Sequence, residues 1–295
     1  MKLLVAGAAG MLGFDVLRVG EAAGHELVAV DVGDFDIADA GAVGRAVESV
    51  APDAVLNCAA WTDVDGAESH REQAFAVNAR GAGNLARAAA QASAPLLHVS
   101  TDYVFDGEAP VDARGAPRAY VESDPTGPRS VYGQSKLAGE REVLAASPRH
   151  TVVRSAWLFG VGGRNFAATM LGLAGEHDAT GSRPSVQVVA DQVGCPTWTG
   201  HLAPALVGLI ERGVSGLVHL AGTGHVSWNG FAAEIFRQAE LACRVEPTTT
   251  AEMPRPAPRP AWSALESERE DVLPLPPWQD GLAGYLAARA GIVRG

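Results

Sequence analysis

Three glycines, Gly7, Gly10 and Gly13, follow the first apolar run of this chain at regular spacing. The run itself, Lys2–Ala6, has the pattern of a short buried strand, and Met11–Ala23 carries apolar residues at helical spacing. Glycines at such a junction permit a tight turn and let a pyrophosphate approach the backbone. The start of the helix then supplies free N–H groups and a partial positive charge. The position of the glycines therefore predicts a dinucleotide-binding turn.

The first half of the chain continues to alternate short apolar runs with helical stretches. Further strands are expected at Glu26–Val30, Ala54–Asn57, Leu96–Ser100 and Thr151–Arg154, and further helices at Ala40–Ser49, Glu72–Ala92 and Gln134–Ala145. This alternation is typical of βαβ units with right-handed crossovers, which put helices on both faces of a parallel sheet. The predicted fold class is therefore α/β, with a Rossmann-type doubly wound parallel sheet.

The rhythm changes after about Phe159, where glycine and proline become frequent. Val186–Asp191 is expected to be a strand, Gly200–Arg212 a helix and Trp278–Ala290 a closing helix. Pro254–Pro260 holds too many prolines for a helix or a central strand, and we expect an extended loop over a site.

Charge and cysteine usage exclude several classes of protein. The net charge is −11 with no basic cluster, which argues against a nucleic-acid-binding protein. Cys58, Cys195 and Cys243 form no CxxC pattern, so we expect buried thiols in a reducing cytoplasm. Leu3–Ala9 is too short and glycine-rich for a signal peptide, and no run approaches the roughly 18 apolar residues of a membrane span. A soluble, cytoplasmic protein is expected.

Asp31, directly after the second predicted strand, bears on the choice of cofactor. A carboxylate there can accept hydrogen bonds from the adenosine ribose, and it would repel a 2′-phosphate. The following residues, Val32, Gly33 and Asp34, include no base. The alternative is a loop or capping aspartate. The sequence thus favours NADH, or dual use of NADH and NADPH.

Tyr132 and Lys136 form a YxxxK pair at the start of a predicted helix, so they share one helix face. A free tyrosine has a pKa near ~10, and a nearby ammonium lowers it by favouring the phenolate. We therefore expect Lys136 to lower the pKa of Tyr132 and to hold the nicotinamide ribose. Tyr132 could then give a proton to a carbonyl oxygen as hydride arrives. YxxxK is also frequent by chance. The pair indicates a catalytic role only together with the glycine turn upstream, which predicts a bound dinucleotide.

Two strand ends supply further candidates. Ser100 and Thr101 end one predicted strand, where doubly wound folds bind ligands, and a hydroxyl there could orient a substrate carbonyl. The alternative is that these hydroxyls only cap the strand. After the preceding strand, Ala59 and Ala60 are small enough for a cofactor to pass close to the backbone.

Longer motifs carry a resemblance to a known family. They are STDYVFDG at 100–107, VYGQSKLAGE at 131–140, DQVGCPT at 191–197 and the closing Arg259–Pro260. Together they closely resemble dTDP-4-dehydrorhamnose reductases, in the extended short-chain dehydrogenase/reductase superfamily, over nearly the whole chain. The resemblance implies NADH- or NADPH-dependent reduction of the C4 ketone of a dTDP-4-keto-6-deoxyhexose. It also implies an NAD(P)-binding domain at residues 1–160, to which later segments return, and a smaller C-terminal substrate domain at 161–295.

The resemblance also implies residue roles. The catalytic set would be Thr101, Tyr132 and Lys136. The cofactor would contact Gly7, Gly10, Met11, Leu12, Asp31, Asp36, Ile37, Ala59, Ala60, Asn78 and Lys136. The dTDP-sugar would contact Thr101, Asp102, Tyr132, Trp157, Asn165, Gln192, Thr197 and Arg259. Taken alone, Trp157 would be assigned to the core, Asn165 and Gln192 to the surface, and Arg259 to a solvated charge.

Departures from the family pattern bear on the sugar. Trp262 and Ser130 each stand where the family often has Asn, and Gly127–Pro128–Arg129 is an unusual turn. The chemistry is unaffected, but a related deoxysugar becomes an alternative to dTDP-L-rhamnose. Some members need magnesium and some dimerise through it. The sequence shows no carboxylate cluster assignable to a metal, and either a monomer or a homodimer is expected.

Two other functions stay open. One is a nucleotide-sugar epimerase or dehydratase on the same fold, which would retain its cofactor through a closed cycle. The other is a non-catalytic regulatory subunit like that of methionine adenosyltransferase. The presence of Thr101, Tyr132 and Lys136 together argues against the second.

Overall fold

A six-stranded parallel sheet forms the centre of the molecule. The computed structural model describes residues 1–178 and 185–293. The strand order is β10-β5-β4-β3-β1-β2, and every neighbouring pair is parallel. The strands are β1 (Lys2–Ala6), β2 (Glu26–Val30), β3 (Ala54–Asn57), β4 (Leu96–Thr101), β5 (Thr151–Ser155) and β10 (Gly216–His219). The predicted fold class is confirmed, and the strand order reverses between β1 and β3, where such folds bind ligands.

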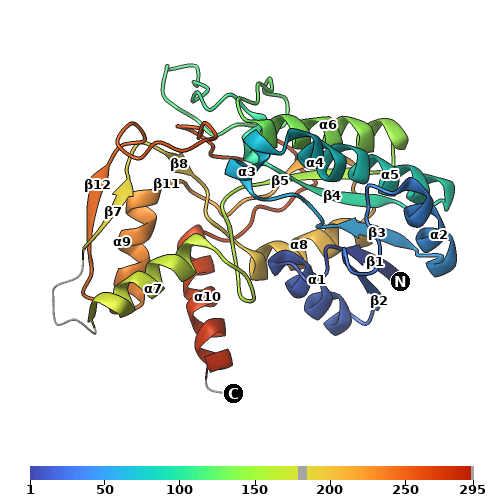
Figure 1. Cartoon of the computed structure of the whole chain (residues 1–295), viewed down its shortest axis with the longest axis horizontal. Coiled ribbons are helices and arrows are strands. Elements are labelled where there is room, and N and C mark those ends of the chain that lie inside the picture. Colours follow the sequence, from blue (N-terminus) through green and yellow to red (C-terminus); the bar gives the residue numbers. More distant parts are fainter. Residues whose placement is uncertain (179–184, 294–295) are drawn as a thin grey trace.

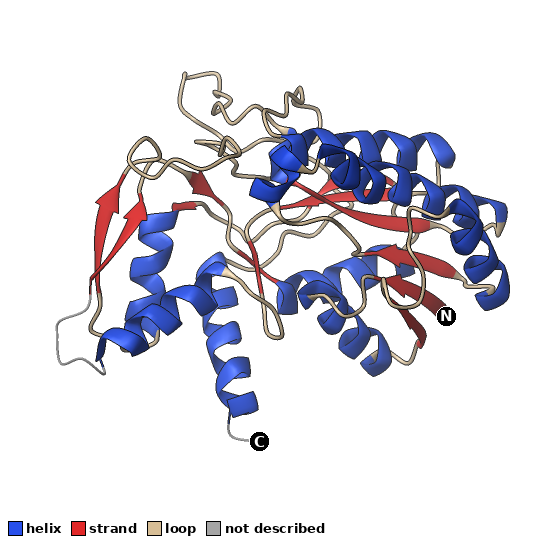
Figure 2. Cartoon of the chain, viewed as in Figure 1, coloured by secondary structure: helices blue, strands red, loops and turns tan. Residues whose placement is uncertain are grey.

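Helices cover both faces of this sheet (Figures 1 and 2). On one face lie α1 (Met11–Ala22) and α8 (Thr199–Glu211); on the other lie α2 (Ala40–Val50), α5 (Ala82–Gln91) and α6 (Val131–Ala146). Alternate strand residues face the two layers. Val5 and Leu56 pack towards α1 and α8, whereas Leu4 and Val55 pack towards α2 and α5. Burial on both faces explains why these strands are continuous apolar runs.

The helix expected over Glu72–Ala92 is interrupted. The chain forms α3 (Val64–Ser69), α4 (Arg71–Phe75), a π-helical segment at Ala76–Gly81, and then α5. A single α-helix was therefore wrong for the middle of this stretch. π-Helical turns inside helices often accompany functional sites, and this one carries Asn78.

A second group of elements lies to one side of the sheet, at the left of Figure 1. It contains α7 (Phe166–Asp178), α9 (Trp228–Gln238) and α10 (Trp278–Val293), with β7 (Ser185–Val189) paired to β12 (Arg244–Thr248). Short parallel β6 (Leu158–Phe159) and β9 (Thr197–Trp198), and antiparallel β8 (Val193–Gly194) and β11 (Val226–Ser227), connect it to the sheet. Its core is rich in aromatic side chains, including Phe159, Phe231, Trp278 and Tyr285.

Later segments return to the central sheet. β10 pairs with β5, and α8 packs against α1 although the two helices are far apart in the sequence. The expected strand over Val186–Asp191 ends earlier, at Val189. Pro254–Pro260 is neither helix nor strand.

The three cysteines differ in how far they are buried. Cys195 is buried. Cys58 is partly exposed as a residue, but burial raises the pKa of its thiol to about 12, so the expectation of buried thiols was wrong only for Cys243. All three are free cysteines.

Within residues 1–178 and 185–293, no helix is both long enough and apolar enough to span a membrane.

Ser130 caps the helix that carries Tyr132 and Lys136. Its Oγ accepts a hydrogen bond of 3.1 Å from Gly133 N, and the side chain is buried. Replacing Ser130 with alanine is expected to lower the free energy of unfolding by about 1 kcal/mol, measured by urea denaturation. Asparagine caps helices as well as serine does, so Ser130→Asn should retain most of the stability. An equal loss in both variants would contradict the capping role.

Candidate active site

The glycine turn after β1 is closely fitted to the loop after β3. Gly7 has a positive φ of 75°, and a Cβ on it would lie 2.5 Å from Ala59 N. A Cβ on Gly13 would lie 2.2 Å from Gly7 O. Helix α1 begins here, and its N-cap residue Gly10 provides no side-chain hydrogen bond. A bare turn and a free helix N-terminus fit the pyrophosphate of a dinucleotide.

Asp31 lies at the end of β2 beside this turn. Its Oδ2 accepts a hydrogen bond of 2.9 Å from Ala9 N, and its Oδ1 accepts one of 2.8 Å from Val32 N. The carboxylate thus fixes the glycine turn and remains next to it. Nearby, Asp36 is exposed, whereas Ile37 is buried against Gly81.

Asn78 links the segment after β3 to α6, the helix that carries Tyr132 and Lys136. It is fully buried, accepts a hydrogen bond of 2.8 Å from Trp61 N and donates one of 2.9 Å to Ser135 Oγ. The segment after β3, including Ala59 and Ala60, is therefore held close to α6. On the opposite side of the turn, Met11 Sδ lies 3.6 Å from Asn165 Nδ2, and Leu12 is buried under the sheet.

Thr101 and Tyr132 converge at the C-terminal end of β4. Thr101 Oγ1 donates a hydrogen bond of 2.8 Å to Asp102 Oδ1, and the Thr101 hydroxyl lowers the pKa of Tyr132. Burial raises the pKa of Asp102 to about 6, although the hydroxyls of Ser263 and Thr101 oppose the shift. The Tyr132 ring meets the ring of Tyr103 edge-on at 5.5 Å. The Thr101 hydroxyl and the Tyr132 phenol thus lie together in a buried region at the C-terminal end of β4.

The expected effect of Lys136 on Tyr132 is not met. Burial raises the pKa of Tyr132 to about 12, the Thr101 hydroxyl lowers it and the Asp102 charge raises it further. The Nζ atom of Lys136 instead donates to Val99 O at 2.6 Å and lies 3.2 Å from His98 Nε2. Burial lowers the pKa of Lys136 itself to about 8. Helical spacing brings the two residues to one face but does not fix where a long, buried side chain points.

An ion pair beneath the site was not predicted. Arg154 from β5 donates to both carboxylate oxygens of Glu140 from α6, at 2.9 and 2.7 Å, and Ser100 Oγ donates to Glu140 at 2.6 Å. Both charged side chains are almost completely buried. Arg154 also lies over the Phe105 ring at 5.0 Å. The pair fixes β4, β5 and α6 relative to one another, and nothing in local sequence spacing indicates it.

Trp157, a predicted substrate contact, occupies a strained backbone position. Its φ is 48°, a left-handed value that costs energy for a bulky residue and is often found at functional sites. The indole stacks on Trp228 at 3.5 Å with an interplanar angle of 3°, and Gly194 backs onto it. The contact of Trp228 with Trp157 was not predicted. In the sequence, Trp228 is only an aromatic residue at the start of a helix, which indicates no particular partner.

The other predicted substrate contacts are occupied within the protein. Asn165 Nδ2 donates to Gly160 O at 2.8 Å, and its Oδ1 accepts from Ala168 N at 2.9 Å. Gln192 Nε2 donates to Thr250 Oγ1 at 2.9 Å. Thr197 is buried, donating to Cys195 O and accepting from Gly222 N. Their contact with a substrate stays a prediction.

Arg259 links the proline-rich loop to α3. Its Nη2 donates to Asp65 Oδ2 at 2.9 Å, while its buried Nη1 has no hydrogen-bond partner among the described residues. The side chain borders a cavity of about 190 Å³, which Tyr103, Arg129 and Ser130 also line. Asp65 was not predicted, since it is far from Arg259 in the sequence. The loop therefore borders a pocket lined by Tyr103, whose ring contacts that of Tyr132.

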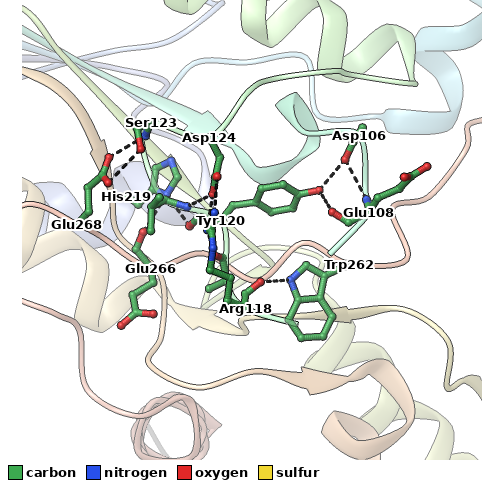
Figure 3. Close-up of polar contacts among 12 residues, drawn as sticks. Asp106, Glu108, Arg118, Tyr120, Ser123, Asp124, His219, Trp262, Glu266 and Glu268 are labelled. Carbon is green, nitrogen blue, oxygen red and sulfur yellow. Dashed lines mark hydrogen bonds and ion pairs between the residues drawn. The ribbon is translucent and has the colours of Figure 1, made fainter. Parts of the chain in front are cut away.

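The segment after Thr101 is tied to the C-terminal part by the contacts in Figure 3. Tyr120 OH donates to Asp106 Oδ1 at 2.7 Å, and its ring stacks on Phe105 at 4.0 Å. Trp262 Nε1 donates to Arg118 O at 2.9 Å. The unusual Trp262 thus fastens a loop, and Ser130 caps α6. Both departures from the family pattern have structural roles.

The described residues contain no cluster of metal-ligating side chains. Across residues 1–178 and 185–293, no group of three or more His, Cys, Asp or Glu side chains is placed to hold a metal ion. Magnesium requires oxygen ligands such as carboxylates, and we assign none here.

Comparisons with known proteins agree with this geometry. A family model described as RmlD substrate binding domain matches residues 1–290. A dTDP-4-dehydrorhamnose reductase of Mycobacterium tuberculosis (strain ATCC 25618 / H37Rv) is 45% identical over 98% of this chain and 93% of its own. A crystal structure of such a reductase from Clostridium acetobutylicum has a TM-score of 0.90 and 38% identity, covering 98% of this chain and 100% of its own.

A third relative adds a bound cofactor. The reductase of Bacillus anthracis, solved in complex with NADP, has a TM-score of 0.90 and 33% identity, and covers 97% of this chain and 99% of its own. Match length, identity and fold therefore agree over nearly the whole chain. The chain belongs to the dTDP-4-dehydrorhamnose reductase family, which the RmlD substrate binding domain describes.

Proposed function

We propose that this protein reduces the C4 ketone of a dTDP-4-keto-6-deoxyhexose with NADH or NADPH, converting dTDP-4-dehydrorhamnose to dTDP-L-rhamnose. The observation that carries the proposal is the convergence of Thr101 and Tyr132 at the end of β4, beside a pocket and close to Lys136. The names of the relatives and the bound NADP of one of them support the same reaction.

Each residue of the catalytic set has a distinct role in this proposal. When bound, the nicotinamide supplies the hydride. Thr101 Oγ1 aligns the sugar carbonyl by a hydrogen bond, and Tyr132 gives its phenolic proton to the carbonyl oxygen as negative charge develops there. The raised pKa of Tyr132 keeps the phenol protonated at neutral pH, as a proton donor requires. Lys136 holds the nicotinamide ribose and balances the charge left on the phenolate.

The remaining assignments concern the cofactor and the nucleotide sugar. Gly7, Gly10 and the start of α1 would hold the pyrophosphate, with Asp31 on the adenosine ribose. Trp157 and Arg259 would contact the dTDP-sugar, Arg259 through its unpartnered Nη1. A reducing cytoplasm suits the three free thiols.

The test is oxidation of NADH and of NADPH by the purified protein with dTDP-4-keto-6-deoxy sugars, followed by NMR of the product. The expected result is stoichiometric cofactor oxidation and a dTDP-6-deoxyhexose reduced at C4. The proton couplings at C4 would identify the stereochemistry. A protein that retains bound NAD and changes the sugar without net oxidation would overturn the proposal in favour of an epimerase.

The charge of Asp31 is expected to limit the use of NADPH. Asp31→Asn removes the carboxylate charge, and its one carbonyl oxygen can still accept from Ala9 N, which keeps the bond to the glycine turn. The bond from Val32 N is lost, but Val32 is exposed and water can replace that acceptor. The ratio of kcat/KM for NADPH over NADH should rise about tenfold, equivalent to about 1.4 kcal/mol. The matched control is Glu21→Gln on α1, an exposed carboxylate away from the turn. An unchanged ratio in Asp31→Asn would contradict the assignment.

A further inference from the structure

A buried polar chain runs behind Lys136, away from the reacting corner. Lys136 Nζ lies 3.2 Å from His98 Nε2, and His98 Nδ1 lies 3.0 Å from Asn57 Nδ2. Asn57 and His98 are completely buried, and Lys136 is almost so. The chain ends at Ala59, whose main-chain N–H donates to Asn57 Oδ1 at 3.0 Å. It thus connects the catalytic lysine to the segment predicted to contact the cofactor.

The contact with Ala59 determines which hydrogens lie along this chain. Because a main-chain N–H can only donate, the atom of Asn57 that faces Ala59 is the carbonyl oxygen. The Asn57 Nδ2 amide therefore faces His98 and donates to Nδ1. A neutral imidazole that accepts at Nδ1 carries its proton on Nε2. His98 thus presents an N–H to Lys136.

The Nε2–H form of His98 favours the neutral form of Lys136. An ammonium has three donors and no acceptor, so it cannot accept a hydrogen bond from His98 Nε2–H. A neutral amine can accept it while donating to Val99 O at 2.6 Å. The other ionisable groups acting on Lys136 are Glu140, on its own helix, and Cys58, after β3, both of which raise its pKa. Burial opposes them and lowers that pKa, which agrees with the selection made by His98.

We propose that Asn57 and His98 are positioning residues that couple the charge of Lys136 to the Ala59 main chain, and through it to cofactor binding. When Lys136 takes up a proton, His98 loses its Nε2 proton, gains one at Nδ1 and stays neutral. The Asn57 amide then rotates so that Oδ1 accepts from His98 Nδ1–H, and the Nδ2 amide takes the place of Oδ1 beside Ala59 N. Two donors now face each other, so the Ala59 N–H is left without an acceptor. The net change is one proton on Lys136. A cofactor oxygen that accepts from Ala59 N–H then satisfies this donor and favours the rotated state.

The coupling predicts whether cofactor affinity rises or falls with pH, and this prediction rests on the proposed function. A cofactor that takes the freed Ala59 N–H binds the protonated state of Lys136 better. Its affinity should therefore be full below the pKa of Lys136, about 8, and should weaken as the pH rises through that value. Equally, cofactor binding should raise the pKa of Lys136.

The direct test is long-range proton–nitrogen NMR of the full chain labelled at histidine nitrogens, with His98 identified by its loss in His98→Gln. We expect His98 in the Nε2–H form at about pH 10 and in the Nδ1–H form at about pH 6. His150 is an internal control, expected to keep the Nε2–H form, because its Nδ1 accepts from Leu96 N and its Nε2 faces Ala86 O. His98 in a single form throughout, or as an imidazolium, would overturn the proposal.

Asn57→Asp tests the coupling in a second way. A carboxylate cannot donate, so His98 must carry its proton on Nδ1 at every pH and offer Nε2 to the Lys136 ammonium. We expect the NMR change to disappear and the Kd for NADH to lose its rise above about pH 8. A variant that keeps the wild-type pH dependence would contradict the coupling. If the variant does not fold, the wild-type NMR result still decides the proposal.

The two proposals fail in different ways. A His98 that changes form in a protein that reduces no nucleotide sugar would refute the proposed function alone. A fixed His98 in an active reductase would refute the coupling alone.

Discussion

Tyr132→Phe is expected to lower kcat for the reduction of the keto sugar by roughly 10²–10⁴-fold, with little change in the Kd for NADH. The substitution removes only the hydroxyl that would protonate the sugar oxygen. The ring, its edge-on contact with Tyr103 and the Lys136 contacts with Val99 all remain. Stopped-flow measurement of NADH oxidation and fluorescence titration of NADH would separate chemistry from cofactor binding.

Tyr120→Phe is the matched control for this prediction. Tyr120 is also a buried tyrosine, but its hydroxyl donates to Asp106 and to Glu108 O in the loop shown in Figure 3. Its loss should reduce stability and leave kcat far less affected than Tyr132→Phe does. Near-normal turnover in Tyr132→Phe would refute the assignment of the proton donor, and equal losses in both variants would point to a structural effect.

Five of the six strands of the central sheet were predictable because their signals are strong and local, whereas β10 was missed. β1, β2 and β3 lie at the residues expected from their apolar runs. Strands covered on both faces, such as β1 and β3, consist mostly of apolar side chains, although β3 ends in the buried Asn57. The helices between them begin and end within a few residues of expectation, as at α1 and α2. The Rossmann-type fold followed from this alternation before any comparison.

The smaller group of elements was largely missed, for physical reasons. Helix α7 contains Gly172 and Gly175, which lower its helix propensity, so packing in the aromatic core stabilises it instead. Strand β12 contains Pro247, which argues against a central strand. Proline is tolerated because β12 belongs to a two-stranded sheet, where each strand is an edge. Local sequence cannot report such tertiary compensation.

Within the site, residue types were predictable but side-chain directions were not. Placing Tyr132 and Lys136 on one helix face required only helical periodicity. That Lys136 points to His98 and Val99 depends on β4, which is remote in the sequence. Arg259 was found by resemblance, whereas Asp65, its partner, carries no local signal. Contacts between distant segments therefore account for most of what the sequence did not reveal.

The second large effect is expected from the buried ion pair beneath the site. Glu140→Ala should lower the free energy of unfolding by about 3–5 kcal/mol, because it leaves the Arg154 charge buried without its partner. Ser100 Oγ also loses its acceptor at 2.6 Å. Urea denaturation monitored by circular dichroism would measure the loss. An exposed ion pair of the same helix gives the comparison needed to attribute it to burial.

That pair joins Glu142 to Arg87 at 2.7 Å, with both side chains half exposed. Because water screens it, Glu142→Ala should cost only about 0–1 kcal/mol. The two variants remove the same group from the same helix, so their difference isolates burial from charge and from helix propensity. Glu140→Leu combined with Arg154→Met should recover much of the stability, since it removes both buried charges together. Equal losses in Glu140→Ala and Glu142→Ala would show that Arg154 is solvated after all, and that β4, β5 and α6 are held together by apolar packing alone.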